Sequence, residues 1–214
     1  MPNRSKIGKV CLTIGLLLVA AALFYSGSVL WTDWQAGVAS EKALAELTAA
    51  HSPQPSAPPR ASAAPADSAP PETPKPVLDP SREMPTAEVN GQAYIGTLSV
   101  PSLGLTLPVI SQWSDARLNL APCRYAGSAY GSGFVIAGHN YRSHFAPLYR
   151  VAIGDEVCFT DVEGMELRYT VAETGVLPPT AIEEMTSTSW DLTLFTCTTS
   201  GEARFAVRCA RAAD

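Results

Sequence analysis

Hydrophobic and polar positions divide the chain into an apolar stretch, a polar middle and a head with short alternating patterns. Residues 10–32 carry no formal charge, and a helix of 23 residues at ~1.5 Å per residue crosses a hydrocarbon core of ~30 Å. From 33 to 50, Val38, Leu44 and Leu47 form a weak amphipathic pattern. We therefore predict a transmembrane signal-anchor helix over 10–32 and a juxtamembrane helix over 33–50.

The charges on either side of the apolar stretch predict its orientation. Arg4, Lys6 and Lys9 lie in a tail of nine residues before it, and Asp33 is the first charge after it. Basic residues stay on the cytosolic side, so a cytosolic N-terminus and an extracellular head of a single-pass membrane protein are expected. The alternative is a cleaved secretory signal peptide, since residues 20–22 are small alanines. The length of the stretch favours the uncleaved anchor, and both interpretations export the head.

Residues 51–86 form a segment rich in proline and alanine. They hold 11 of the 18 prolines of the chain, together with 6 alanines and 5 serines. A segment of this composition buries too little apolar surface to fold, so we predict a disordered linker. Fully extended at ~3.1 Å per residue, it would act as a stalk reaching about 100 Å from the bilayer.

The head, residues 87–214, is predicted to be mainly β. The turn Pro101-Ser102-Leu103-Gly104 lies between two alternating patterns, at 94–100 and 105–109. Residues 133–137 form a continuous apolar run, which predicts a strand buried on both faces. Further strands are predicted at 155–160, 166–174, 192–197 and 204–209, and brief helices at 145–151 and 180–186. This pattern is typical of a barrel or a sandwich.

The charge of the head excludes one class of function. From 87 to 214 there are 8 arginines, no lysines and 13 acidic residues, and the whole chain has a net charge of -5. Proteins that bind nucleic acid usually present a basic surface, so no nucleic-acid partner is expected. The sequence also has no Gly-rich phosphate loop and no metal-ligand spacing. We therefore predict neither a cofactor nor a metal.

Four of the five cysteines lie in the head, which raises the question of two disulfides. Cys197 ends an apolar strand and precedes a polar turn, the position that a nucleophile needs in order to be rigid and still meet substrate. Cys158 and Cys209 fall within strand patterns and are predicted to be small buried side chains. Whether Cys123 pairs with either of them stays open.

A cysteine nucleophile needs a group that transfers protons and a donor for the oxyanion. Of the two histidines in the head, His139 follows the buried strand at 133–137, although a lone histidine is more often structural. Arg204 and Arg208 share one face of the strand after Cys197. They are four residues apart, about 13 Å along a strand, so both cannot contact one reacting carbon.

These residues resemble a known family. Thr193-Leu194-Phe195-Thr196-Cys197 matches the Thr-Leu-x-Thr-Cys signature of sortases, the membrane-anchored cysteine transpeptidases of Gram-positive bacteria. Residues 137–140 (Ala-Gly-His-Asn) resemble the segment with their catalytic histidine, and residues 203–207 resemble the strand with their essential arginine. The order His, Cys, Arg and the spacings of 58 and 7 residues also agree with the family. The resemblance covers the whole head.

The resemblance implies an eight-stranded sortase-type β-barrel with short helices. It implies Cys197 as nucleophile, His139 as general acid/base and Arg204 as the group that stabilises the oxyanion or positions substrate. The reaction implied is cleavage of the Thr-Gly bond of a Leu-Pro-x-Thr-Gly-like sorting signal through a thioester. Transfer to an amine of a peptidoglycan precursor or a pilin lysine would follow. Thr196 is expected either to contact substrate or to pack within its strand.

Several alternatives remain at this point. A non-catalytic surface binding module with a sortase-like fold would need only the anchor, the stalk and the β head. A papain-like protease places its cysteine before its histidine, which is the reverse of the order found here. A disulfide-stabilised scaffold would leave no free thiol at Cys197. Asp79-Pro80 resembles the lid motif of pilin-assembling sortases, although the composition of the linker also explains both residues. The subgroup, the sorting signal and the acceptor amine stay open.

Overall fold

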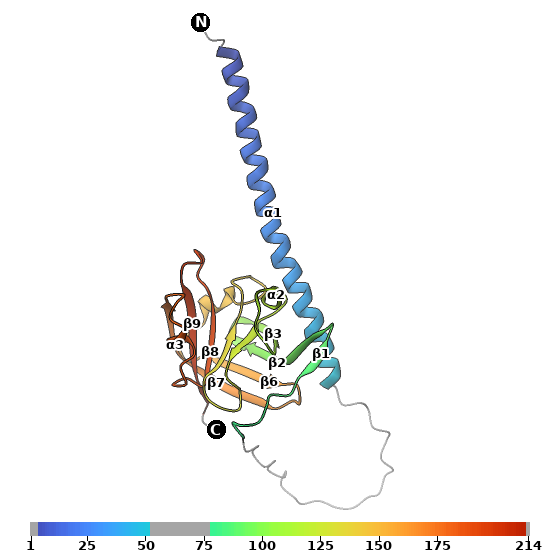
Figure 1. Ribbon diagram of the computed structural model, residues 1–214, viewed down its shortest axis with the longest axis vertical. Helices are drawn as coiled ribbons and strands as arrows, with labels where there is room; N and C mark the ends of the chain where they lie inside the picture. Colours follow the sequence, from blue (N-terminus) through green and yellow to red (C-terminus); the bar gives the residue numbers. More distant parts are fainter. Residues whose placement is uncertain (1–3, 52–77, 213–214) are drawn as a thin grey trace, which may run out of the picture.

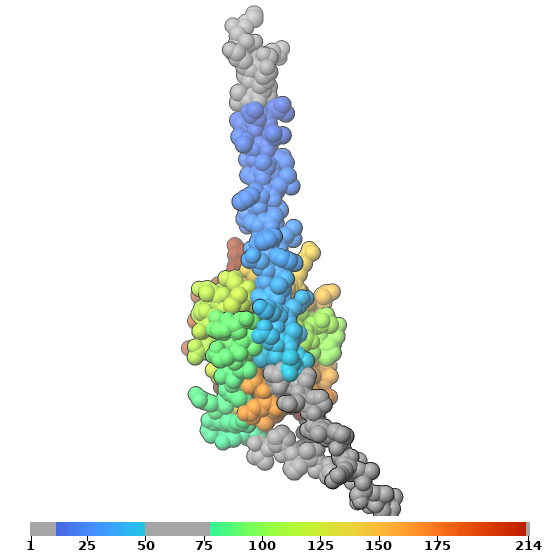
Figure 2. Space-filling view, turned by 90° about the vertical axis from the view of Figure 1, so that its right-hand side faces the viewer, coloured from blue at the N-terminus to red at the C-terminus, as the bar shows by residue number. Residues whose placement is uncertain are grey.

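The computed structural model describes residues 4–51 and 78–212, with side chains from 12–49 and 78–212. A single helix, α1 (Arg4–His51), precedes a β-barrel (Figure 1). The N-terminal half of α1 projects beyond the barrel, and its C-terminal half lies along it (Figures 1 and 2). The part of α1 from Leu12 to Ala49 is long and apolar enough to cross a membrane. None of its most apolar stretch is buried against the barrel.

Nine strands form the described sheet. They are β1 (Ala87–Val89), β2 (Gln92–Val100), β3 (Leu105–Ile110), β4 (Cys123–Ala126), β5 (Phe134–Ala137), β6 (Glu156–Asp161), β7 (Glu166–Leu177), β8 (Leu192–Cys197) and β9 (Arg204–Arg211). Their order is β1-β2-β3-β4-β5-β8-β9-β7-β6, and β6 also pairs with β2. This last pairing closes eight strands into a ring, with β1 attached to β2 outside it. The prediction of a mainly β, eight-stranded barrel is confirmed.

Short helical turns connect the strands. They are η1 (Pro101–Leu103), α2 (Asp115–Leu118), η2 (Ala146–Arg150) and α3 (Ile182–Met185). The predicted turn at 101–104 is the 3-10 turn η1, which ends at Gly104 with a positive φ of 62°. Both predicted helices are present but are only four or five residues long.

The barrel closes where β2 meets β6 at a glycine. The register of β2 against β3 shifts between Tyr94 and Gly96, which is a β-bulge. Gly96 pairs with Asp161, and a Cβ at Gly96 would lie 2.1 Å from the carbonyl oxygen of Thr160. Only glycine allows this approach, so the bulge and the absent side chain together let the sheet curve onto itself.

The core of the barrel follows the alternation of the strands. Phe134 and Ile136 of β5 point inward with Leu192 and Leu194 of β8. Alternate residues of the same strands, Val135, Ala137 and Phe195, form a second apolar cluster on the outer face with Ala206 of β9 and Met185 of α3. Strand β5 is buried on both faces, as its continuous apolar run predicts.

The described chain resumes inside the predicted linker. Residues 52–77, most of that linker, lie outside the described residues. Residues 78–86 run over the barrel, where Met84 is buried in the main core and Arg82 pairs with Glu163. The sequence predicts these nine residues as part of the stalk, because the segment is rich in proline and small residues. A single buried methionine changes that composition too little to indicate packing against the barrel.

The predicted stalk does not separate the head from α1 in the structure. Ala43 and Leu47 of α1 share a buried apolar cluster with Tyr94 and Ile110 of the barrel. The helix therefore contacts the barrel directly. This contact, and not the length of the linker, determines how far the barrel lies from the apolar half of α1. This differs from the expectation of a head held at a distance by residues 51–86.

Candidate active site

Two parallel strands bring His139 beside Cys197. β5 pairs with β8 in parallel register, with Ala137 opposite Phe195, and the N–H of Gly138 donates to the carbonyl of Phe195 at 3.0 Å. His139 and Cys197 each come two residues after this pair. The carboxyl ends of neighbouring parallel strands meet at one edge of a sheet, so both side chains lie at the same edge.

The strand on the other side of β8 supplies the arginine. β9 is antiparallel to β8, and Arg204 is the direct partner of Cys197, while Arg208 is the partner of Thr193. Directly opposed residues have Cβ atoms roughly 4.5–5.5 Å apart. The register therefore decides between the two arginines and places Arg204 next to the thiol.

His139, Cys197 and Arg204 line one cavity of about 240 Å³. Its floor includes Ala137 and Phe195 of the outer-face apolar cluster. Further residues around it are Trp113, Asp115, Leu118, Tyr125, Gly138, Pro179, Ile182, Met185 and Thr196. The cavity is thus mostly apolar and is lined by a thiol, an imidazole and a guanidinium, a combination typical of a substrate site.

Aromatic side chains form one wall of this cavity. Trp113 packs edge-to-face against Tyr125 with ring centroids 5.7 Å apart, and Tyr125 packs likewise against Phe195 at 5.3 Å. Trp113 is 44% exposed. Sequence reasoning did not find Trp113 or Tyr125, because they precede and follow α2 and meet Phe195 only through the pairing of distant strands.

His139 lies in a partly buried position against an aromatic ring. Its imidazole stacks on Tyr141, with centroids 4.6 Å apart and an interplanar angle of 28°. Burial lowers the pKa of His139 below its ordinary value, and the negative charge of Asp115 opposes this shift. No hydrogen bond joins His139 to Cys197 among the described residues. Hydrogen bonds within a catalytic pair are often long before substrate binds, so the relevant observation is that both residues line one cavity.

Arg204 makes its hydrogen bonds to the turn that follows Cys197. Its Nη1 donates to the carbonyls of Gly201 and Ala203, at 3.2 and 3.1 Å. A guanidinium has five N–H donors, so these two bonds leave others for a substrate oxygen. Arg208 is committed elsewhere, because its Nη1 pairs with Glu173 at 2.6 Å.

The hydroxyl of Thr196 is buried and has no hydrogen-bond partner within the described residues. Thr196 is 1% exposed, and it is one of the residues that line the cavity. Its burial agrees with packing within the strand, and its place in the lining of the cavity keeps contact with substrate a prediction.

Tyr149 of η2 contacts the main chain of Cys197. Its hydroxyl donates to the carbonyl of Cys197 at 3.1 Å, and its ring stacks on Phe205 at 4.5 Å. No sequence signal indicates this role, because an exposed tyrosine after Pro147 is ordinary in a turn. The contact fixes the end of β8 and thereby the position of the thiol.

All four cysteines of the barrel are free thiols. Burial raises the pKa of Cys123 and of Cys209 to about 12, which keeps both protonated at neutral pH. Cys158 is only partly buried on β6, so the prediction of a buried side chain was wrong for it and right for Cys209. The outward position of Cys158 in the alternation of β6 explains the difference.

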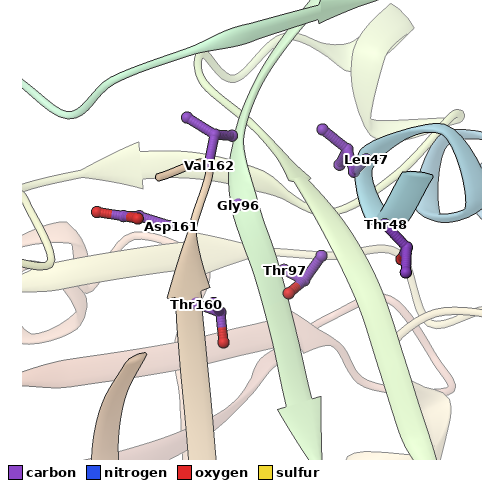
Figure 3. Close-up of a pocket in the computed structure, with 7 residues that line it drawn as sticks. All are labelled: Leu47, Thr48, Gly96, Thr97, Thr160, Asp161 and Val162. Atoms are coloured by element: carbon purple, nitrogen blue, oxygen red, sulfur yellow. The ribbon is translucent and has the colours of Figure 1, made fainter. Parts of the chain in front are cut away.

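A second cavity, of about 160 Å³, lies between the end of α1 and strands β2 and β6 (Figure 3). It is lined by Leu47, Thr48, Gly96, Thr97, Thr160, Asp161 and Val162. Both carboxylate oxygens of Asp161 accept hydrogen bonds from the barrel, and the side chain points away from Leu47 in Figure 3. With no nucleophile or histidine in its lining, this cavity offers less chemistry than the one at Cys197.

The segment with Asp79-Pro80 lies far from the thiol along the strands. Pro80 lies next to Gly131, in the loop that leads into the start of β5, whereas His139 follows the end of β5. The oxygen Oδ1 of Asp79 accepts bonds from the backbone and hydroxyl of Ser81, a local turn. In this position, Asp79-Pro80 does not cover the cavity of Cys197.

The comparison with protein families decides the family of this chain. Residues 98–212 match the model of the sortase domain. The chain belongs to the sortase family. Among curated proteins, none is similar enough in sequence to be matched.

Solved sortase structures resemble the barrel. Sortase C1 from Streptococcus suis is 28% identical over 56% of this chain and 74% of its own, with a TM-score of 0.51. Sortase A from Corynebacterium diphtheriae is 25% identical over 57% of this chain and 62% of its own, with a TM-score of 0.53. A pilus-related sortase C of Group B Streptococcus is 25% identical over 59% and 70%, with a TM-score of 0.51. Family and fold together support a transpeptidase of sortase type.

Proposed function

We propose that this chain is a cysteine transpeptidase that acts through a thioester on Cys197. The observation that carries the proposal is the meeting of Cys197, His139 and Arg204 in one cavity, from the ends of three neighbouring strands. A merely structural cysteine gains nothing from such neighbours. The same observation disfavours the non-catalytic binding module.

In the first half of the reaction, the thiolate of Cys197 attacks the carbonyl carbon of the Thr-Gly bond in a Leu-Pro-x-Thr-Gly-like signal. The carbonyl becomes an oxyanion, and Arg204 donates to it from the strand opposite the thiol. His139 gives its proton to the departing glycine nitrogen, the C–N bond breaks, and a thioester remains on Cys197.

In the second half, an amine attacks the thioester carbon, the C–S bond breaks, and a new amide forms. The proton released by the amine returns to the Cys197 and His139 pair, which restores the starting state. The apolar floor and the aromatic wall of the cavity shield the thioester, which disfavours water relative to the amine.

The substrates and the location follow from the same proposal. The donor is a surface protein with a sorting signal, and the acceptor is an amine of a peptidoglycan precursor or of a pilin lysine. Residues 10–32 serve as an uncleaved anchor with a cytosolic tail at 1–9, and the barrel at 87–214 lies outside the cell. The aromatic pair Trp31 and Trp34 at the end of the apolar stretch supports this placement, since tryptophan prefers the membrane interface.

Peptide cleavage with and without an amine tests the proposal. The full-length chain in detergent micelles is incubated with Leu-Pro-x-Thr-Gly peptides that differ in x, and the products are separated by chromatography. We expect cleavage after threonine, and a shift of product from the free acid to the amide as triglycine or a lysine peptide is added. Cleavage that persists in Cys197→Ala, or a wild-type chain that alkylates at Cys197 but cleaves no peptide, would contradict it.

A further inference from the structure

The residues of α1 that face the barrel are mostly small. We call residues 33–49 the docked segment. Ala36, Ser40, Ala43 and Leu47 are its buried residues and are each 2–3% exposed. Their spacing of four, three and four places them on one face of the helix. Figure 2 shows this part of α1 lying against the barrel, whereas the preceding apolar half is free of it.

The docked segment holds the loop that follows the catalytic histidine. We call residues 139–145 the histidine loop. The carboxylate of Asp33 accepts from the backbone N–H and the hydroxyl of Ser143, at 3.2 and 2.8 Å. The hydroxyl of Ser40 donates to the carbonyl of Leu120 at 2.9 Å and lies 3.3 Å from Nε2 of His144. Ser40 therefore accepts from His144, and Nε2 carries the proton.

The histidine loop transmits this contact to His139. The ring of Tyr141 stacks on His139 and also tilts against His144, with centroids 5.5 Å apart. The backbone N–H of Phe145 donates to the carbonyl of His139 at 3.1 Å, and the N–H of His144 donates to the carbonyl of Tyr141 at 3.0 Å. The loop is thus a closed turn, and a shift at Ser143 or His144 moves His139 with it.

The fit between helix and loop is tight at Gly37, so a large side chain there must push Ser143 away. A Cβ at Gly37 would lie 3.2 Å from the Cβ of Ser143, which is closer than ordinary van der Waals contact. At Gly27, on the same helix, no atom lies within 4 Å of such a Cβ. The two glycines therefore offer a matched pair of sites, one in the contact and one outside it.

We propose that the docked segment of α1 is a positioning element for His139. Asp33 and Ser40 of the docked segment hydrogen-bond to the histidine loop. The orientation of the imidazole relative to Cys197 depends on these hydrogen bonds. The consequence for catalysis rests on the proposed transpeptidase function, whereas the effect on the order of the loop does not. A barrel produced without α1 keeps the thiol but loses the constraint on its histidine.

A wedge in the contact tests the proposal. Full-length Gly37→Leu and its control Gly27→Leu are compared in nanodiscs by hydrogen exchange and by peptide cleavage. We expect residues 139–145 to exchange at least tenfold faster in Gly37→Leu, with β8 unchanged, and kcat to fall with little change in KM. In Gly27→Leu, both quantities should stay at the wild-type level. Equal exchange of the loop in the two variants would overturn the proposal.

A conservative pair at Asp33 separates positioning from general damage. Asp33→Asn keeps an oxygen that accepts from Ser143, and Asp33→Ala removes it. We expect Asp33→Ala to reproduce the loss of kcat and Asp33→Asn to restore most of it. Equal activities of the two variants would contradict a positioning role for the hydrogen bonds between Asp33 and Ser143.

A crosslink tests the contact without any substrate. In the double variant Gly37→Cys and Ser143→Cys, the two Cβ atoms would lie 3.2 Å apart, slightly closer than the roughly 3.5–4.5 Å of a disulfide, so a small outward shift of the loop lets the bond form. We expect the disulfide to form in the full-length chain, seen as a linked peptide after proteolysis. Its absence would overturn the docking. If the wild-type chain cleaves no peptide, the transpeptidase proposal fails. Hydrogen exchange and crosslinking still test whether the docked segment orders the histidine loop.

Discussion

Directly before His139, only glycine fits between the end of β5 and the ring of Phe145. A Cβ at Gly138 would lie 2.5 Å from that ring, and Phe145 is fully buried. In Gly138→Ala, either the ring or the histidine loop must move, which destabilises the fold by about 1–3 kcal/mol. We expect a lower Tm and a lower kcat/KM.

The matched control for this substitution is Gly175→Ala on β7. No atom lies within 4 Å of a Cβ at Gly175, so its free energy of unfolding should change by less than about 0.5 kcal/mol. Thermal unfolding and peptide cleavage of both variants check the prediction. A Gly138→Ala chain with the Tm and activity of Gly175→Ala would show that the Phe145 contact does not position His139.

His144 makes the contact between α1 and the barrel sensitive to pH. Burial lowers the pKa of His144 to about 4, with a smaller contribution from His139, while Asp33 and the carbonyls of Ala36 and Leu120 oppose the shift. The unfolded chain binds this proton below pH ~6.5 and the folded chain only near 4. Stability is therefore complete above pH ~6.5 and declines as the pH falls toward 4, by up to about 3 kcal/mol.

Thermal unfolding at pH 7.5 and pH 5 in the wild type and in His144→Gln measures this contribution. The wild type should lose more Tm than His144→Gln between the two pH values, because glutamine takes up no proton. Identical pH dependence in both chains would mean that His144 is not buried as a neutral group.

At the scale of elements, β9 presents two arginines with different roles. Arg204 faces Cys197, whereas Arg208 pairs with Glu173 and lies over Trp190. Removing an oxyanion donor lowers kcat by roughly 10²-fold or more, so Arg204→Ala should lose activity at an unchanged Tm. Arg208→Ala should lose a few degrees of Tm and keep its activity. Steady-state kinetics with thermal unfolding checks both, and a reversed pattern would assign the site to Arg208.

The elements that sequence predicted are those with a clear period. The hairpin at 92–110 and strands β5 to β9 show either alternation or an apolar run. Strand β4 (Cys123–Ala126) was missed because it has four residues and a register shift within it, and β1 because it has three. The closure of β2 on β6 joins strands about 60 residues apart and leaves no local pattern.

Only the part of the candidate site that has a local sequence pattern could be predicted. Cys197, His139 and Arg204 lie at strand ends, where a motif and a buried run can be read along the chain. Trp113, Tyr125 and Tyr149 approach them only through tertiary packing. The docked face of α1 was also missed. The amphipathic pattern rests on large residues, of which Val38 is 45% exposed and Leu47 is buried, whereas the rest of the buried face consists of alanine and serine, which are too small to mark it.

For the whole molecule, with residues 10–32 in the bilayer as proposed, docking of α1 fixes the distance between the barrel and the membrane. The docked segment has 17 residues and is about 25 Å long, so the barrel surface against it begins near the end of the apolar stretch. An extended linker would instead allow separations of about 100 Å. Because Asp33 contacts Ser143, the histidine loop lies at the end of the docked segment nearer the apolar stretch.

Energy transfer from a fluorophore on Cys197 to acceptor lipids in nanodiscs measures this separation. Cys158→Ser and a reagent that does not enter membranes restrict the label, since Cys123 and Cys209 are buried. We expect strong transfer, as for a site within about 30 Å of the headgroups. Transfer at background level would mean that the barrel is held away from the bilayer.

In the proposed reaction, Cys197 carries the acyl group. Intact-mass spectrometry of the full-length chain, after incubation with Leu-Pro-x-Thr-Gly peptides and no added amine, tests it most directly. Cys197→Ala is the test variant, and Cys158→Ala is the matched control. We expect an adduct equal to the peptide truncated after threonine in the wild type and in Cys158→Ala, no adduct in Cys197→Ala, and loss of the adduct when an amine is added. An adduct that persists in Cys197→Ala, or none in a wild-type chain whose Cys197 alkylates readily, would contradict it.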